Sequence, residues 1–204
     1  MAATLHLFTD FVCPFCFIAE HSTVPQLLAR YDLELNWCGF ELHPGTPPGG
    51  RPLSSLFPGV NLAAMHAQTK RFAASFGVTG FEPPNRLQNS RRALALAEVA
   101  REQGCLQALR TALFDAHWRH GADLEDSATL QQLASRVGMD APAALAQADT
   151  PQVLALVDAR QQEARRNGVT GIPTFVIGKS RVVGCQPYTA LAAAAEREQV
   201  PHRR

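Results

Sequence analysis

Cys13-Pro14-Phe15-Cys16 follows the apolar run Leu5-His6-Leu7-Phe8-Thr9 and begins a segment with the pattern of a helix. Pro14 suits the first helical position, where its fixed φ is helical and its missing N–H has no partner to lose. Cys13 is therefore predicted at the N-cap, with Cys16 one turn further on and beside it. Two thiols in this arrangement can cycle between a dithiol and a disulfide.

The two cysteines are expected to have different roles. A thiolate on Cys13 would face the free N–H groups of Phe15 and Cys16 and the positive end of the helix, which stabilise its charge. Cys13 is therefore the predicted nucleophile. Cys16 is the predicted resolving thiol, which attacks a mixed disulfide on Cys13 and releases the substrate.

A structural zinc site is the competing interpretation of this motif, because CxxC also provides two zinc ligands. No second CxxC follows, and the remaining cysteines stand alone at Cys38, Cys105 and Cys185. We therefore predict a redox pair and no metal.

Composition limits the class of protein. The chain has 204 residues, of which 46% are hydrophobic and 18% charged, enough for one domain or one domain with a large insertion. A formal net charge of +1 argues against nucleic acid or an anionic membrane as partner. The start of the chain lacks the pattern of a signal peptide, and no apolar run approaches the roughly 18 residues of a membrane span. We expect a cytoplasmic protein, in which five cysteines are catalytic or free.

Hydrophobic periodicity and turn residues indicate the order of elements. A strand at 5–9 precedes a helix from Pro14 to about Arg30, with a kink or break at Pro25, and a strand at 33–37 follows. After a Pro/Gly loop at 44–50, nearly everything from Asn61 to Gly168 is expected to be helical. A hairpin follows at 174–177 and 181–184 with its turn at 178–180, and Pro187 opens a last helix.

Gly171-Ile172-Pro173 stands immediately before the first hairpin strand. An X-Pro bond at such a tight entry is a candidate for the cis form, although an ordinary trans proline at a strand start remains open.

Taken together, these elements resemble the thioredoxin fold in its DsbA-like branch, where a helical domain is inserted after the second strand. The similarity extends to the FrnE-type family through the segments 10–16, 40–44, 47–50 and 184–187. It covers essentially the whole chain. The expected fold is α/β, with a discontinuous thioredoxin-like domain at 1–45 and 165–204 and an inserted helical subdomain at 46–164.

This resemblance implies a thiol–disulfide oxidoreductase that acts on protein or small-molecule thiols and disulfides through a mixed disulfide on Cys13. It also implies that Pro173 is cis and positions the substrate opposite the CxxC motif. Pro14, Phe15 and Ile172 would line the substrate surface. No bound cofactor or metal is expected, glutathione is a candidate co-substrate, and the oligomeric state is left open between monomer and homodimer.

The chain departs from the family pattern at two positions that are candidate auxiliary groups. Glu20 stands where these proteins often carry a basic residue, and it is either a solvated surface carboxylate or a proton acceptor for Cys16. Cys185 replaces a small residue, and it is either a small buried side chain or an auxiliary redox thiol. Because Pro14-Phe15 carries no charge, we expect a reduction potential of about −200 to −270 mV, less oxidising than DsbA.

Two other functions remain open. The 2-hydroxychromene-2-carboxylate isomerases and kappa-class glutathione transferases resemble this architecture, but they usually carry serine where Cys13 stands. A redox-sensing or chaperone-like binding module is the third hypothesis.

Asp115, His117 and His120 suggest a metal site, yet their spacing favours a helix surface with partly buried rings. Arg91 and Arg92 are predicted to lie on a solvated helix face.

Overall fold

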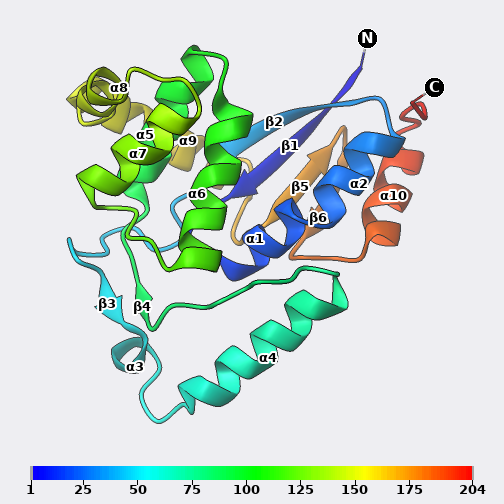
Figure 1. Cartoon of the computed structure of the whole chain (residues 1–204). Helices are drawn as coiled ribbons and strands as arrows, with labels where there is room; N and C mark the ends of the chain where they lie inside the picture. The colour runs from blue at the N-terminus through cyan, green and yellow to red at the C-terminus, as the bar shows by residue number, and fades with distance from the viewer. Residues whose placement is uncertain (1, 204) are drawn as a thin grey trace.

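A mixed four-stranded sheet forms the centre of the computed structural model, which describes residues 2–203 (Figure 1). Its order is β2-β1-β5-β6. Strand β1 (Ala3–Thr9) pairs in parallel with β2 (Leu33–Gly39) and antiparallel with β5 (Thr174–Ile177), which pairs antiparallel with β6 (Ser180–Val183). This topology confirms the predicted α/β thioredoxin fold.

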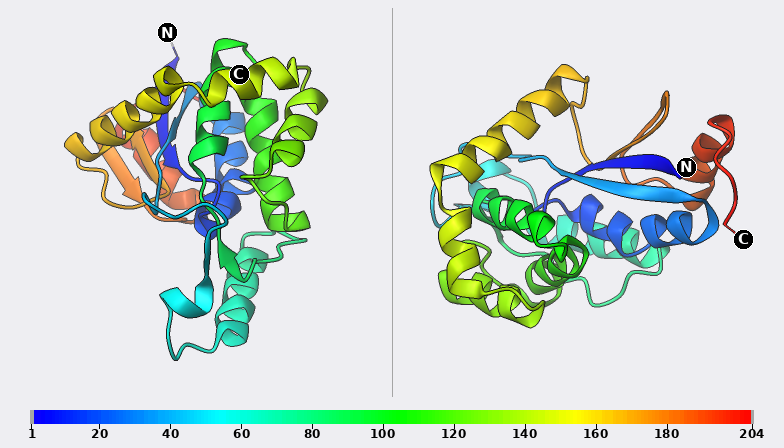
Figure 2. Two further views of the ribbon diagram at one scale, coloured as in Figure 1. Left: turned by 90° about the vertical axis from the view of Figure 1, so that its left-hand side faces the viewer. Right: turned by 90° about the horizontal axis from the view of Figure 1, so that it is seen from above.

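Alternation along the strands divides the sheet into two faces. Leu5 and Leu7 of β1 are fully buried on one face. The alternate residues His6 and Phe8 point to the other face and are half-buried. Helices α1 (Pro14–Glu20) and α2 (Thr23–Arg30) lie on one side of the strands, and α9 (Pro151–Arg166) lies on the other (Figure 2). The last helix, α10 (Tyr188–Arg197), contacts α2 and the hairpin.

The predicted kink or break at Pro25 is a break between two helices, and it falls a few residues before Pro25. Helix α1 ends at Glu20 and α2 begins at Thr23. Pro25 therefore lies in the first turn of α2, where a backbone N–H has no partner within the helix. Its missing donor costs nothing at that position, so the chain restarts the helix rather than bending it.

The insertion between β2 and β5 is mainly helical, as predicted, but it begins with a small two-stranded sheet. Its elements are β3 (Arg51–Pro52), α3 (Leu53–Leu56), α4 (Leu62–Ser75), β4 (Arg86–Leu87), α5 (Arg91–Glu102), α6 (Leu106–His120), α7 (Ser127–Arg136), α8 (Ala141–Ala148) and α9. Side chains of Asn61, Asp126, Asp140 and Thr150 cap α4, α7, α8 and α9. Figure 1 shows α4 extending away from the other helices, below α1. The proposed domain boundaries stay a prediction.

The insertion and the sheet share one apolar core. Phe114 on α6 packs against Phe11, with ring centroids 5.0 Å apart, and Phe11 in turn packs against Trp37 of β2 at 5.3 Å. All three side chains are almost completely buried. Among residues 2–203, no helix has the length and hydropathy needed to cross a membrane.

Candidate active site

Cys13 stands at the N-cap of α1 with Pro14 at the first helical position, as predicted, but its thiol does not cap the helix. The N–H of Cys16 donates to the backbone carbonyl of Cys13 at 3.1 Å. The Cys13 thiol faces the carbonyl of Ile172 instead, with Sγ 3.9 Å from the oxygen. The protonated side chain thus points towards a segment 159 residues away in the sequence, and the expected contact of a Cys13 thiolate with the helix N–H groups stays a prediction.

The Ile172–Pro173 peptide bond opposite Cys13 is cis. The carbonyl of Pro173 accepts a hydrogen bond from the N–H of Gly184 at 2.7 Å, so the end of β6 holds this loop in place. Gly184 has a φ of 85°, in the left-handed region that favours glycine. The loop and the N-terminus of α1 thus form the two sides of one site.

Cys16 lies behind Cys13 and is fully buried. Burial raises the pKa of its thiol well above the ordinary value, and hydrogen bonding to Cys13 and the charge of that neighbour add to the effect. Cys16 therefore keeps its proton when a thiolate forms on Cys13. This asymmetry agrees with the roles of nucleophile and resolving thiol.

Cys185 and Cys38 lie in separate places. Cys185 directly follows Gly184 and is half-buried, and burial together with the charge of Cys13 raises the pKa of its thiol to about 12. Cys38 lies with His6 at a cavity on the sheet face that carries α9. Cys185 is thus a neighbour of the redox pair, and its auxiliary role stays a prediction.

Glu20 is not a surface carboxylate. Its side chain is 5% exposed, accepts a hydrogen bond from Trp37 Nε1 at 2.9 Å and pairs with Arg110 at 3.6 Å. Burial raises its pKa, and the charge of Arg110 opposes that shift. These partners come from β2 and α6, so Glu20 joins the helical insertion to the sheet.

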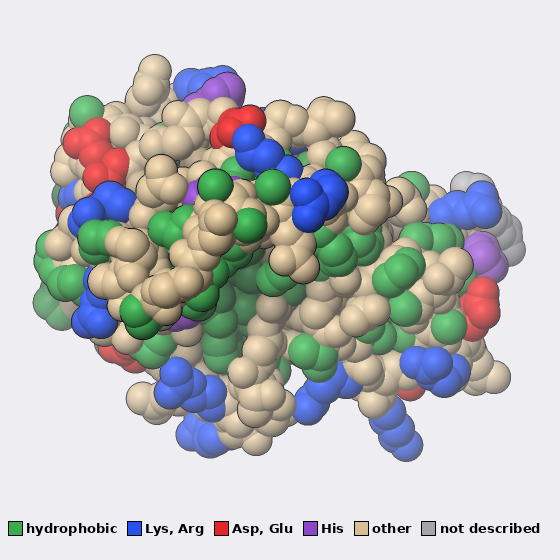
Figure 3. Space-filling model, turned by 90° about the horizontal axis from the view of Figure 1, so that it is seen from below, with side chains coloured by type: hydrophobic (Ala, Val, Ile, Leu, Met, Phe, Trp, Pro, Cys, Tyr) green, Lys and Arg blue, Asp and Glu red, His purple; other side chains and the backbone are tan. Residues whose placement is uncertain are grey.

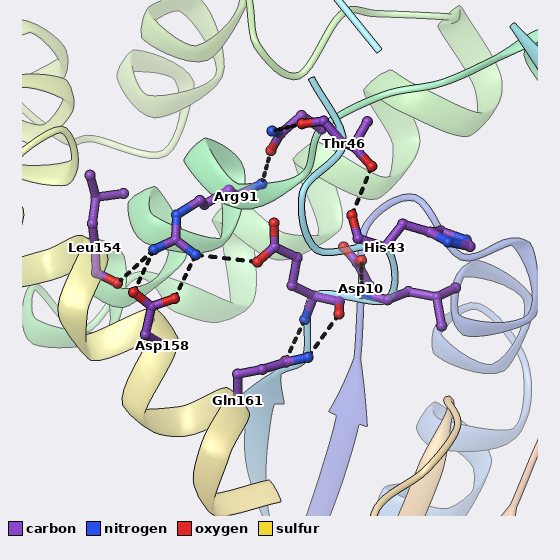
Figure 4. A network of polar contacts seen from close by, with 10 residues as sticks. Asp10, His43, Thr46, Arg91, Leu154, Asp158 and Gln161 are labelled. Carbon is purple, nitrogen blue, oxygen red and sulfur yellow. Dashed lines mark hydrogen bonds and ion pairs between the residues drawn. The ribbon is translucent and has the colours of Figure 1, made fainter. Parts of the chain in front are cut away.

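A polar network holds the loop that follows β2 against the active-site strand (Figure 4). Asp10 Oδ2 accepts the N–H of Leu42 at 2.8 Å. Gln161 of α9 exchanges two hydrogen bonds with the backbone of Glu41, at 2.8 and 2.9 Å. Arg91 pairs with Glu41 and Asp158, so the prediction that it lies on a solvated face is wrong.

Arg92 is also paired, through two hydrogen bonds to Asp149 at 2.7 and 2.6 Å. Its guanidinium additionally donates to Ser127 and to the carbonyl of Glu125, and its side chain is 27% exposed. Neither arginine is a free cation on a solvated helix.

The helical insertion supplies contacts to the CxxC segment that sequence reasoning did not assign. Trp118 Nε1 of α6 donates to the carbonyl of Phe11 at 2.7 Å. The Phe72 ring of α4 meets Phe15 edge-on, with centroids 5.5 Å apart. No local pattern could have revealed either pairing, since the partners are 107 residues apart in the first case.

The suggested metal site is not formed. Asp115 pairs with Arg119 at 2.6 Å and with His21 at 3.0 Å. His117 is buried, and burial lowers the pKa of its imidazole to about 4. Within residues 2–203 there is no group of three metal-binding side chains.

Comparisons with known proteins find similar sequences and structures over nearly the whole chain. The sequence model described as the DSBA-like thioredoxin domain matches residues 4–196. A probable DsbA oxidoreductase from Streptomyces coelicolor is 26% identical, with a TM-score of 0.82 over 99% of this chain and 93% of that one. A 2-hydroxychromene-2-carboxylate isomerase superposes with a TM-score of 0.78 at 19% identity, covering 96% of each chain. The cytosolic disulfide reductase DsbM from Pseudomonas aeruginosa, solved with glutathione, gives 0.70 at 20% identity, covering 95% of this chain and 99% of that one.

Proposed function

The chain belongs to the DSBA-like thioredoxin domain family, and we propose that it is a thiol–disulfide oxidoreductase whose working pair is Cys13 and Cys16. The observation that carries this proposal is the position of the Cys13 thiol. It lies at the start of α1, faces the carbonyl before the cis Pro173, and has the buried thiol of Cys16 behind it.

The reaction proceeds in two exchanges. The Cys13 thiolate attacks one sulfur of a disulfide substrate, forms a mixed disulfide, and releases the other half of the substrate as a thiolate. Cys16, once deprotonated, attacks Sγ of Cys13 and displaces the remaining half as a second thiolate. The substrate gains two electrons, and the protein becomes the Cys13–Cys16 disulfide. The reverse sequence oxidises two thiols.

The cis-proline loop positions the substrate in this scheme. The backbone of Ile172 pairs with the extended substrate next to its sulfur, while Pro14 and Phe15 form the opposite wall. Phe15 is 42% exposed, which leaves its ring available for contact.

Glutathione is the proposed reductant. Two molecules of glutathione return the Cys13–Cys16 disulfide to the dithiol and leave as glutathione disulfide, so the cycle balances. The structure of DsbM with glutathione supports this choice. A cytoplasmic setting is part of the same proposal, and the likeness to DsbM, which is described as a cytosolic disulfide reductase, supports it.

The test compares wild type with Cys13→Ser. Reduced wild-type protein is mixed with bis(2-hydroxyethyl) disulfide, and the loss of protein thiols is followed by acid quench, alkylation and mass. The proposal expects two thiols lost per chain in the wild type and loss of the reaction in Cys13→Ser.

The isomerase alternative is tested with the same proteins. Its supporting observation is the likeness in fold to 2-hydroxychromene-2-carboxylate isomerase. If Cys13→Ser turned over 2-hydroxychromene-2-carboxylate with glutathione while wild type left the disulfide unreacted, the isomerase would replace the oxidoreductase.

A further inference from the structure

A mainly apolar cavity of about 260 Å³ adjoins the CxxC motif on the side that faces the insertion. Val12 and Pro14, the chain neighbours of Cys13, both line it, and Phe15 does so as well. Met65 on α4 and Trp118 on α6 belong to the opposite walls. Figure 3 shows the face on which α4 lies, with hydrophobic side chains gathered around a hollow. The steps proposed above place the substrate against Pro14 and Phe15, but they give no role to the part of the cavity that α4 and α6 form.

The size of the cavity suits one organic group rather than a peptide segment. An engineered cavity of about 150 Å³ with apolar walls is large enough for benzene. The cavity here therefore has room for a single ring with a short substituent. It is smaller than the range of about 300 to 1,000 Å³ that is usual for drug-sized ligands.

The charge of the walls restricts the ligand further. Arg86 is the one lysine, arginine, aspartate or glutamate among the lining residues, and its guanidinium already donates to the carbonyls of Gly49 and Gly50. A carboxylate-bearing half such as a glutathionyl group would lose hydration here without gaining a free cation. An uncharged group is the chemistry that the cavity matches.

Three imidazoles line the cavity, those of His43, His66 and His117, and the last two offer hydrogen-bonding atoms to a ligand. Nε2 of His66 is buried and has no hydrogen-bond partner. Nδ1 of His117 lies 3.4 Å from the carbonyl of Ala122, so this nitrogen is the donor and Nε2 of the neutral ring is an acceptor. A ligand with one hydroxyl group would satisfy an imidazole that the protein leaves unpaired.

The enclosure of the nucleophile argues for a small substrate. Cys13 is 2% exposed, and α4 approaches it through the contact between Phe72 and Phe15. A disulfide on a folded protein arrives with the bulk of its own chain. A slender molecule reaches such a sulfur more easily, with its apolar part passing over Pro14 into the cavity.

We propose that this cavity binds the uncharged, ring-bearing half of a low-molecular-weight disulfide while Cys13 attacks its sulfur. This inference rests on the proposed function. The Cys13 thiolate forms the new S–S bond to the sulfur of the ring-bearing half, and the other half leaves as a thiolate. Cys16 then displaces the ring-bearing thiolate. The substrate disulfide is the oxidant and the protein dithiol is the reductant.

The test first measures binding without chemistry. Calorimetry follows binding of 4-hydroxybenzyl methyl sulfide, which has no exchangeable sulfur bond, to reduced wild type and three variants. Met65→Glu places a charge in the wall, and Thr69→Trp fills the cavity from the same helix. Gln68→Glu adds the same charge at an exposed position of α4 that does not line the cavity. Circular dichroism confirms that each variant is folded.

We expect both cavity variants to weaken binding about tenfold or more, which is the scale for one apolar group in a pocket. Gln68→Glu should match wild type. Absence of binding to wild type, or equal loss in Gln68→Glu, would overturn the cavity assignment whether or not the protein exchanges disulfides.

The second measurement concerns rate. Reduced proteins react with bis(4-hydroxybenzyl) disulfide, bis(2-hydroxyethyl) disulfide or insulin, and the second-order rate constant for thiol loss is compared. The preference of wild type for the ring-bearing over the hydroxyethyl disulfide should fall about tenfold in Met65→Glu and Thr69→Trp. Insulin reacting as fast as the ring-bearing disulfide, with no change in the cavity variants, would contradict a small-molecule substrate. No reaction with any of the three would refute the oxidoreductase proposal, while the binding result would still stand.

Discussion

Replacing Asp10 with asparagine should change how the stability of the protein depends on pH. Asp10 is completely buried three residues before Cys13. Burial raises the pKa of this carboxyl to about 6, although hydrogen bonds from Leu42, Ser90 and Val12 oppose the shift. Each pKa unit corresponds to about 1.4 kcal/mol, so the rise from 3.8 to about 6 amounts to about 3 kcal/mol.

The direction in which stability changes with pH follows from proton binding. Because the folded state holds the Asp10 proton more tightly than the unfolded chain, this contribution to stability is fully present below pH 3.8 and is lost as the pH rises through about 6. Asparagine keeps an oxygen that can accept the Leu42 N–H and does not titrate. The free energy of unfolding of wild type minus that of Asp10→Asn should therefore fall by about 2 to 3 kcal/mol between pH 4 and pH 7.5.

Urea unfolding of the reduced proteins, followed by circular dichroism at half-unit steps of pH, measures this difference. Glu34→Gln, which removes one exposed carboxylate from β2, is the matched control and should show no such trend. A difference between wild type and Asp10→Asn that stays constant over the whole range would refute the reasoning.

Three further predictions concern the redox pair and its support. Trp37→Phe should lower the free energy of unfolding by about 1 to 3 kcal/mol in urea titrations, since buried Glu20 loses a hydrogen bond; unchanged stability would contradict the buried role of Glu20. Equilibration with glutathione buffers should give a reduction potential of about −200 to −270 mV for the Cys13–Cys16 pair, and a value above about −150 mV would contradict it. If Cys185 is an auxiliary thiol, mild oxidation of Cys16→Ser should yield a Cys13–Cys185 disulfide in peptide maps, whereas a free Cys185 throughout would leave it a packing residue.

The parts of the fold that sequence could predict depend on local chemistry. Local signals fix the start of a helix or the place of a turn through residues only a few positions away. Examples are Pro14 in the first turn of α1, the cap residue Asn61 of α4, and the hairpin turn at Gly178. The strands can likewise be predicted, because hydrophobic and polar residues alternate along them in the sequence. Even here the turn is shorter than expected, since β6 begins at Ser180 and leaves Gly178 and Lys179 between the strands.

The parts that sequence missed depend on distant partners. Glu20 looks like a surface carboxylate beside its own helix, and only the approach of Trp37 and Arg110 makes it a buried one. Arg91 resembles a solvated helix residue until α9 brings Asp158 to it. The contact of the Cys13 thiol was not predicted for the same reason, because its partner belongs to the segment before the hairpin.

The positions of the two motif cysteines at the start of α1 could be predicted from the sequence. The cavity beside them could not. Its walls come from α3, α4, α6 and the segments around them, which are far apart in the chain. No spacing of residues in the sequence brings such a set together. The proposal for the substrate class therefore rests on the structure and not on the sequence.

Trapping the intermediate tests the central claim most directly. Reduced Cys16→Ser and Cys13→Ser are each incubated with bis(2-hydroxyethyl) disulfide, and the intact masses and peptide maps are recorded. We predict that Cys16→Ser accumulates one mercaptoethanol adduct, located on Cys13, and that Cys13→Ser accumulates none on Cys16 because that thiol is fully buried and holds its proton. An adduct on Cys16 in Cys13→Ser, or none on Cys13 in Cys16→Ser, would contradict the assignment of nucleophile and resolving thiol.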